Sequence, residues 1–392
     1  MSEEVNWSEL PEELLQKIAV HLFSDTELIS FRSVCRTWRS SAADKRFPSR
    51  RLIRLSPLVH RERAHHHGAF LSRATYFRVT LPLASVQRAW MIKVEELESG
   101  KRRLLSPLSR LPINHSCQIL DLLKFGVSEI EEGYAVKCFQ KERTVSGFQR
   151  VAMVTVAGET QVLGIGCDGK LRYWNGEIWI KIKNQADTLC DITVHRGITY
   201  VIDINGIVWW LHSFGLVQYS PPLHSHGNDK SFVESRGELY VVDRFMKGKA
   251  RKGRAIADAF RQQFGIRCLH AFIQDTDGAR PCNIVKECEF ETVSFKVYKL
   301  DEEWGRWMEV KSLGDRAFVM ATDCCFSVSA LEFNGCLENS IYFTDEDEDE
   351  QKPGFGLNGH DLRVFKLDDG SITYLKSFYN HFQMFFPSFL ET

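Results

Sequence analysis

The sequence predicts a mainly β protein that begins with a small helical module, and three observations support this. The spacing of apolar residues follows a helical period clearly only in residues 8–46. Beyond that segment, short apolar stretches alternate with glycine turns, which is the pattern of β-hairpins. The 27 Phe, 10 Tyr and 9 Trp suit half-buried, pleated surfaces better than helices.

Two apolar stripes predict two short helices in the N-terminal module. Pro11 suits the first turn of the first helix, and Ser24 with Glu27 forms a predicted capping box for the second. The two stripes consist of Leu14, Leu15, Ile18, Ala19 and Leu22, and of Leu28, Phe31, Val34, Cys35 and Trp38. So small a module cannot bury both stripes within itself, and the surplus apolar surface indicates a partner.

The order and spacing of these residues resemble the F-box motif. The matching series is Leu10-Pro11-x-x-Leu14-Leu15-x-x-Ile18, then Leu28, then Val34-Cys35-Arg36-x-Trp38-Arg39. This resemblance implies binding to a Skp-family adaptor and, through the adaptor, to a cullin scaffold. The adaptor-binding positions that it implies are Leu10, Pro11, Leu14, Ile18, Leu28, Val34, Cys35 and Trp38.

Trp38 and the Leu10-Pro11 pair are the expected anchors of that interface, because a few large apolar side chains usually dominate binding. The alternative is that the stripes form a private core or pack against the following domain. Periodicity cannot separate inward-facing residues from partner-facing ones.

Glycine turns divide the remainder of the chain into hairpins. The turns are predicted at Asp168-Gly169, Asn175-Gly176, Arg196-Gly197, Asn205-Gly206, Arg236-Gly237 and Asp369-Gly370. Equivalent hairpin strands begin at Leu171 and Val208, 37 positions apart. Repeats of about 40–50 residues with four strands are typical of propeller blades. The sequence therefore predicts an F-box in residues 1–50 and a β-propeller of six or seven blades in residues 51–392, with a β-sandwich as the alternative fold.

The C-terminal domain resembles kelch-like propellers, and more narrowly the C-terminal domain of a group of plant F-box proteins. The stretches that carry this resemblance are Asn339-Ser-Ile-Tyr-Phe-Thr-Asp and Val364-Phe-Lys-Leu-Asp-Asp-Gly-Ser-Ile. The sequence departs from true kelch repeats, because it lacks their recurring pair of glycines. The resemblance implies a domain that recognises a protein substrate, whose binding residues the sequence does not identify.

Several motifs resemble cofactor- or metal-binding sites, but the neighbouring sequence does not fit such sites. Gly164-x-Gly166-x-x-Gly169 matches a dinucleotide-binding pattern, but a predicted strand follows it where a helix would be needed. His65-His66-His67 lacks the spacing of zinc ligands, and Cys282 and Cys288 have no evident companions. We therefore expect no catalytic residues, no cofactor and no metal.

Two charged segments stand out. The acidic run Asp345–Glu350 predicts a solvated insertion between strands, with docking of a basic partner as the alternative. The basic cluster predicts a charged loop, with nuclear import as the alternative, and consists of Lys247, Lys249, Arg251, Lys252 and Arg254.

Composition limits the protein's location and partners. The net charge of −1 gives no global attraction to nucleic acids or anionic membranes, so neither is an expected partner. The N-terminus lacks the apolar segment of a signal peptide, and eleven scattered cysteines suit a reducing compartment, which predicts the nucleus or cytoplasm. The predicted function is the non-catalytic substrate-recognition subunit of a Skp–cullin–F-box ubiquitin ligase. The alternatives are an F-box protein that acts outside a ligase and a propeller enzyme.

Overall fold

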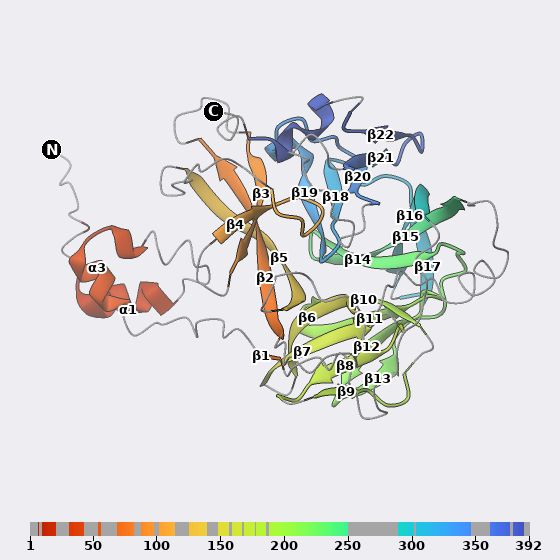
Figure 1. The fold of residues 1–392 in the computed structure, drawn as a ribbon, viewed down its shortest axis with the longest axis horizontal. Coiled ribbons are helices and arrows are strands. Elements are labelled where there is room, and N and C mark those ends of the chain that lie inside the picture. Colours follow the sequence, from red (N-terminus) through yellow and green to blue (C-terminus); the bar gives the residue numbers. More distant parts are fainter. Residues whose placement is uncertain are drawn as a thin grey trace, which may run out of the picture.

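A computed structural model shows a mainly β protein with a helical N-terminal module (Figure 1). It describes residues 7, 10–20, 31–42, 54–55, 69–81, 88–97, 102–113, 125–138, 148–156, 159–166, 168–176, 178–185, 188–249, 289–301, 303–345, 361–376 and 379–387. The predicted domain boundary at residue 50 lies outside these residues.

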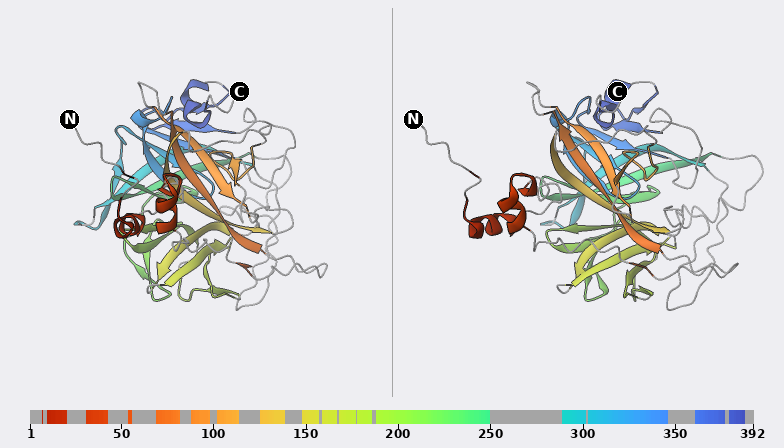
Figure 2. Two further views of the ribbon diagram at one scale, coloured as in Figure 1. Left: turned by 90° about the vertical axis from the view of Figure 1, so that its left-hand side faces the viewer. Right: turned by 60° about the vertical axis from the view of Figure 1, so that its left-hand side comes forward.

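The first helix of the module, α1 (Glu12–Val20), begins where the sequence predicts. The carbonyl oxygen of Pro11 accepts hydrogen bonds from the backbone N–H groups of Leu14 and Leu15 at 3.0 and 3.1 Å. Glu12 and Glu13 occupy the first turn, where the helix dipole favours negative charge. The views in Figure 2 show that the module lies outside the array of sheets.

The second apolar stripe is not one continuous helix, which corrects the prediction. Residues 31–33 are helical, the chain bends at Val34, and Cys35 adopts an extended conformation with φ −159° and ψ 180°. A new helix, α3 (Arg36–Ser41), begins after Cys35. Val34 therefore lies at a bend between two helical segments, whereas the sequence pattern would place it within one helix.

The strands in the described part of the chain form five sheets. The first contains β1 (Arg54–Leu55), β2 (Ala69–Thr80), β3 (Trp90–Glu96), β4 (Arg102–Leu105) and β5 (Gly126–Cys138). The second contains β6 (Phe148–Val156), β7 (Glu159–Gly166), β8 (Leu171–Trp174) and β9 (Trp179–Lys181). The third contains β10 (Leu189–His195), β11 (Ile198–Asp203), β12 (Val208–His212) and β13 (Gly215–Gln218).

The last two sheets differ in their topology. The fourth contains β14 (Asp229–Ser235), β15 (Glu238–Lys249), β16 (Glu289–Asp301) and β17 (Arg306–Val310) in simple antiparallel order. The fifth contains β18 (Arg316–Met320), β19 (Cys325–Ser329), β20 (Ser340–Phe343), β21 (Arg363–Lys366) and β22 (Ile372–Tyr374). In this sheet β18 pairs with β19 antiparallel and with β20 parallel. The 3₁₀ helices η3 (Ala330–Glu332) and η5 (Tyr379–Phe385) accompany the fifth sheet.

The five sheets form a ring, as the blades of a propeller do. The innermost strands β5, β6, β10, β14 and β19 contact one another in that order. The ring closes where Ala89 and Phe333 form a parallel bridge and where η5 packs on β3. This arrangement confirms the predicted propeller and excludes a two-sheet sandwich.

The described residues form five blades, whereas the sequence predicted six or seven. The prediction divided chain length by repeat length, but two long insertions fall within single blades. Residues 250–288 separate β15 from β16, and residues 344–362 separate β20 from β21, although each pair of strands is hydrogen-bonded. Chain length therefore predicts more blades than the described residues form.

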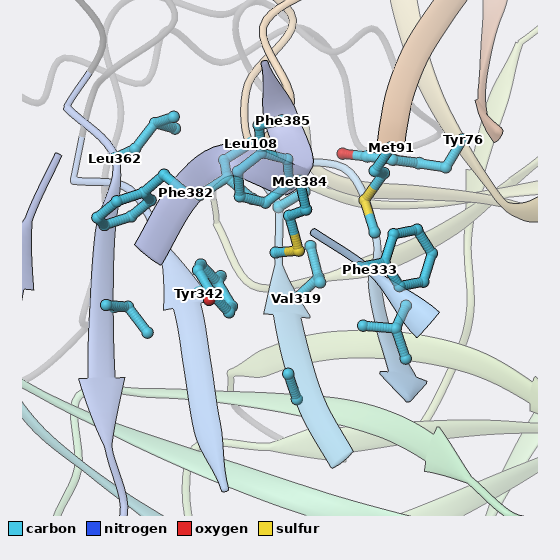
Figure 3. Close-up of a cluster of buried hydrophobic side chains, with 14 of the residues drawn as sticks. Tyr76, Met91, Leu108, Val319, Phe333, Tyr342, Leu362, Phe382, Met384 and Phe385 are labelled. Atoms are coloured by element: carbon cyan, nitrogen blue, oxygen red, sulfur yellow. The ribbon is translucent and has the colours of Figure 1, made fainter. Parts of the chain in front are cut away.

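A large apolar core joins the first and last blades (Figure 3). Tyr76 and Met91 come from the first sheet, Val319 and Tyr342 from the fifth, and Phe382 from η5. The hydroxyl group of Tyr342 donates a hydrogen bond to the carbonyl oxygen of His381 at 2.8 Å. The C-terminal segment thus packs into the joint that closes the ring.

The glycine turns occur where the sequence predicts them. Gly169 has φ +67° and leads from β7 directly into β8, so the dinucleotide-like pattern is a hairpin turn followed by a strand. At the β11–β12 turn, Gly206 has φ +73°, and a Cβ atom there would lie 2.3 Å from the Cβ of Leu223. This position requires glycine for both conformation and space. Among the described helices, none is long and apolar enough to cross a membrane.

Candidate interaction sites of the module and the propeller

The helical module divides its apolar residues between an internal core and an outer face. Leu15, Ala19, Phe31 and Ala42 are buried together. Leu14 and Ile18 lie on the other side of α1, one turn apart, with 46% and 40% of their surface exposed. The structure thereby separates buried from exposed apolar residues, which periodicity could not do.

The outer face continues beyond α1. Val34, at the bend before α3, is 52% exposed, and Pro11 is also exposed. Among the described residues predicted to bind the adaptor, Pro11, Leu14, Ile18 and Val34 thus have substantial surface available to a partner. Leu28 lies outside the described residues.

The two remaining expected anchors contribute to the module's own core. Leu10 and Trp38 are half-buried and pack against the internal cluster. The ring of Trp38 lies 4.6 Å from that of Phe31, and its indole Nε1 donates a hydrogen bond to the carbonyl oxygen of Trp7 at 3.0 Å. Trp38 therefore stabilises the module, and its contact with an adaptor stays a prediction.

A central cavity of about 300 Å³ lies on the axis of the propeller. It is lined by the innermost strands of the first four blades and by the β18–β19 hairpin of the fifth. The lining residues include Glu131, Arg150, Glu234, Asp323 and Cys325. Burial, together with the negative charges of nearby carboxylates, raises the pKa of Glu131 to about 7. The cavity is thus acidic and holds a carboxyl group that titrates near neutral pH.

Neighbouring groups hold Arg150 and Cys325 of this cavity in place. Arg150 is held by Asp191 at 2.7 Å, and its Nη2 contacts the Sγ atom of Cys325 at 3.1 Å. Burial raises the pKa of the Cys325 thiol to about 11, so the nucleophilic thiolate is scarce at neutral pH. No group of three or more His, Cys, Asp or Glu residues in the described ranges is arranged to hold a metal ion.

A buried ionic cluster lies beside the cavity and links the first blade to the fifth. The carboxylate of Asp323 accepts from Lys93 Nζ and from Arg110 Nε, both at 2.8 Å. Burial opposes its ionisation, but the two cations outweigh that effect and lower the pKa of Asp323 to about 2. Arg110 also contacts Glu95 at 3.2 Å, which extends the cluster within the first blade.

A second cavity, of about 390 Å³, lies between the third and fourth blades. We call it the interblade groove. Its floor consists of the buried side chains Tyr200, Phe232 and Val241, and Trp307 and Met308 of β17 form one wall. Its remaining lining residues include His195, Arg196, Tyr219, Glu238, Lys299 and Asp301.

Asp345, the first residue of the acidic run, is not solvated, contrary to the prediction. Its side chain is buried and ion-paired with Arg244 and Arg363, and it accepts a hydrogen bond from the backbone N–H of Thr292 at 2.9 Å. Burial opposes its ionisation, but these partners lower its pKa below the usual value. Residues 346–350 lie outside the described residues.

The first two lysines of the basic cluster lie on a strand and not in a loop. Lys247 and Lys249 are in β15, opposite Glu291 and Glu289 of β16. Arg251, Lys252 and Arg254 lie outside the described residues, as do His65-His66-His67, Cys282 and Cys288.

The sequence analysis missed both cavities and the ionic cluster. Each combines residues from different blades: Lys93 and Asp323, for example, are 230 positions apart. Trp307 of β17 was visible in the sequence, but its packing beside the third blade left no local signal.

Comparison with known proteins agrees with this architecture. The F-box-like family matches residues 7–53, and the KIB1-4 beta-propeller family matches residues 62–366. F-box protein At2g17690 of Arabidopsis thaliana is 43% identical, over 98% of this chain and 100% of its own length. F-box protein At4g35733 of the same plant is 38% identical, over 99% of each chain. F-box protein SKIP23, also from this plant, is 28% identical, over 98% of this chain and 94% of its own length. The chain therefore belongs to the F-box proteins that carry a KIB1-4 beta-propeller.

Proposed function

We propose that this protein is the substrate-recognition subunit of a Skp–cullin–F-box ubiquitin ligase. The F-box module binds a Skp-family adaptor, which connects the protein to a cullin, and the propeller binds a protein substrate. The chain itself performs no chemistry. It raises the local concentration of substrate lysines near the ubiquitin-charged enzyme. The free thiols of Cys190, Cys324 and Cys325 suit a reducing compartment such as the nucleus or cytoplasm.

The observation that carries this proposal is the outer apolar face of the module. Leu14, Ile18 and Val34 are each at least 40% exposed, although the same module buries Leu15 and Phe31 in a common core. Burial of a large apolar side chain in an interface contributes about 1.5–3 kcal/mol. Leu14, Ile18 and Val34 are about half-exposed, so each would contribute part of that free energy when a partner covers the face.

The decisive experiment replaces this face while it preserves the module's core. In a Leu14→Asp, Ile18→Asp double variant, we expect co-purification of a Skp-family adaptor to be lost, because two carboxylates would be buried without partners. Leu331→Asp, at a residue of the propeller that is 66% exposed, serves as the matched control and should retain the adaptor.

The same pull-down distinguishes the alternatives. Recovery of both adaptor and cullin supports a ligase, and recovery of the adaptor without cullin supports a role outside one. If the double variant keeps the adaptor while Trp38→Ala loses it without unfolding, the interface lies on the other side of the module.

A further inference from the structure

We propose that the interblade groove is the substrate-docking site, and that it binds an extended peptide segment in which a large apolar side chain is followed closely by an acidic one. This inference rests on the proposed function, because it assigns the substrate-recognition role to one surface of the propeller. The apolar part of the segment is indicated by the floor of the groove and the acidic part by its rim.

The groove can accept a large apolar side chain. Its volume of about 390 Å³ is within the usual range for ligand sites, and its floor is built from buried aromatic and aliphatic side chains. The indole Nε1 of Trp307 donates to the carbonyl oxygen of Pro221 at 2.9 Å, which fixes the ring as one wall. Met308 is 42% exposed beside it, and methionine adapts readily to side chains of different shape.

The rim carries a guanidinium group that lacks an ion-pair partner in the described residues, and its charge also acts on the nearby carboxylate of Glu238. Arg196 is exposed on the β10–β11 turn and donates one hydrogen bond, to the carbonyl oxygen of Gly237 at 2.7 Å. No carboxylate in the described ranges forms an ion pair with it. The corresponding arginine of the next blade, Arg236, is instead paired with Asp315.

The other rim charges are largely compensated. Lys299 is paired with Glu238 at 2.7 Å, and Asp301 contacts Arg306 at 3.6 Å. Arg196 is thus the rim cation that has no ion pair in the described ranges, and a guanidinium whose N–H groups can donate to a ligand favours a carboxylate on the bound segment.

The backbone fixes this arginine in place. Arg196 has φ +50° and Gly197 has φ +78°, so the two form a tight turn with left-handed conformations at both positions. The side chain thus projects from a rigid hairpin next to the apolar floor. A bound segment could therefore bury one apolar side chain on the floor and place one carboxylate against Arg196.

The test uses the full chain and four sets of short synthetic peptides on a glycine–serine scaffold. One set carries Trp or Leu followed by Glu, a second carries Trp or Leu followed by Lys, a third carries Glu without the apolar residue, and a fourth carries neither. Fluorescence anisotropy measures their affinity. We expect the first set to bind most tightly and the fourth not to bind.

Two groove variants have matched controls outside the groove. Met308→Glu should weaken binding of the first set about tenfold or more, whereas Val217→Glu, at a residue that is 45% exposed on β13, should not. Arg196→Glu should weaken that set about tenfold and make the Lys-containing set the tighter binder. Lys183→Glu, at an exposed site on the second blade, should change neither affinity.

Several results would overturn the proposal. These are equal affinity for the first two sets, unchanged binding in Met308→Glu, and binding of a free aromatic carboxylate as tight as that of the peptides. Dimerisation of the chain that Met308→Glu abolishes would instead make a second copy the occupant. Adaptor capture by the groove variants is measured in parallel: loss of peptide binding with capture intact refutes the groove, while absence of capture in the wild-type chain refutes the proposed function.

Discussion

At the residue scale, Asp323 connects two blades, because its one carboxylate pairs with two buried cations. Lys93 and Arg110 lie on the first blade, and Asp323 lies on the fifth. A buried charge that loses its partner is strongly destabilising, whereas an exposed ion pair contributes little. The closure of the ring thus depends on an ionic contact as well as on apolar packing.

We predict that Asp323→Asn lowers the free energy of unfolding by about 3–5 kcal/mol, since it removes the carboxylate that pairs with buried Lys93 and leaves Arg110 with Glu95 as its remaining buried counter-charge. Urea denaturation measures this change. The control is Asp315→Asn, which removes an ion pair with Arg236 that is largely exposed and should cost less than about 1 kcal/mol. Equal losses of stability in the two variants would show that the buried ion pairs of Asp323 stabilise the fold no more than the exposed pair of Asp315.

Glu131 makes stability depend on pH. Its pKa is about 7 in the folded protein and near 4.5 ordinarily. Between pH 4.5 and pH 7, Glu131 is therefore mostly protonated in the folded state and mostly ionised in the unfolded chain. Stability should therefore fall as pH rises from 4.5 to 7, and the loss persists above pH 7.

We predict that Glu131→Gln raises the free energy of unfolding at pH 8 by about 1–2 kcal/mol, with a smaller gain near pH 4.5. Denaturation curves at a series of pH values measure the difference, and the exposed Glu303→Gln is the matched control. A gain that is the same at every pH would contradict the titration of Glu131 as the cause.

At the scale of elements, the sequence predicted hairpins reliably because their signal is local. Asn205-Gly206 and Arg236-Gly237 each supply the left-handed residues that a tight turn requires, and both are turns in the structure. The helical module was predicted with its first helix correct and its second helix unbroken. The break at Cys35 left no mark in the apolar spacing, because Val34 and Trp38 keep helical intervals across it.

Contacts between blades could not be predicted, because local sequence patterns do not report them. The interblade groove pairs Tyr200 with Trp307 across two sheets, and the buried ion pairs of Asp345 connect β15 of the fourth blade with β21 of the fifth. Such contacts depend on how blades pack, which hydrophobic spacing within one blade does not encode. For the F-box, in contrast, family resemblance named the positions, and the structure was needed to show that Leu14 faces outward while Trp38 faces inward.

A test at this scale compares two glycines that share a conformation but differ in surroundings. Gly206 and Gly197 have φ +73° and +78°, yet a Cβ at Gly206 would meet Leu223, whereas no atom lies within 4 Å of one at Gly197. Gly197→Ala should cost about 1–2 kcal/mol of backbone strain. Gly206→Ala should cost about 2–4 kcal/mol, because a steric clash is added to the strain. Thermal unfolding measures both, and equal losses would mean that Leu223 moves aside freely.

At the scale of the whole molecule, the ring closes without a strand shared between its two ends. In the described part of the chain, β2–β5 of the first blade and β18–β22 of the fifth belong to separate sheets. The bridge between Ala89 and Phe333, the core around Tyr342 and the cluster at Asp323 hold the blades together instead. The C-terminal η5 completes this joint, since Phe382 and Met384 are fully buried in it.

Phe382→Ala should therefore weaken the entire propeller and not merely loosen its C-terminus. Removal of a buried phenylalanine costs about 3–5 kcal/mol. Because Phe382 contacts the joint that closes the ring, the loss should appear in every blade. Far-ultraviolet circular dichroism and the fluorescence of Trp174 and Trp179, which lie in the second sheet, should report one common, lowered unfolding midpoint.

Tyr379→Ala is the matched control for this prediction. Tyr379 also lies in η5 but is 42% exposed, so its removal should change the unfolding midpoint little. An early transition seen by circular dichroism, with the tryptophan fluorescence of the second sheet unchanged, would show that the blades unfold independently. The joint would then be a local contact, and closure of the ring would contribute little to the stability of the substrate-binding domain.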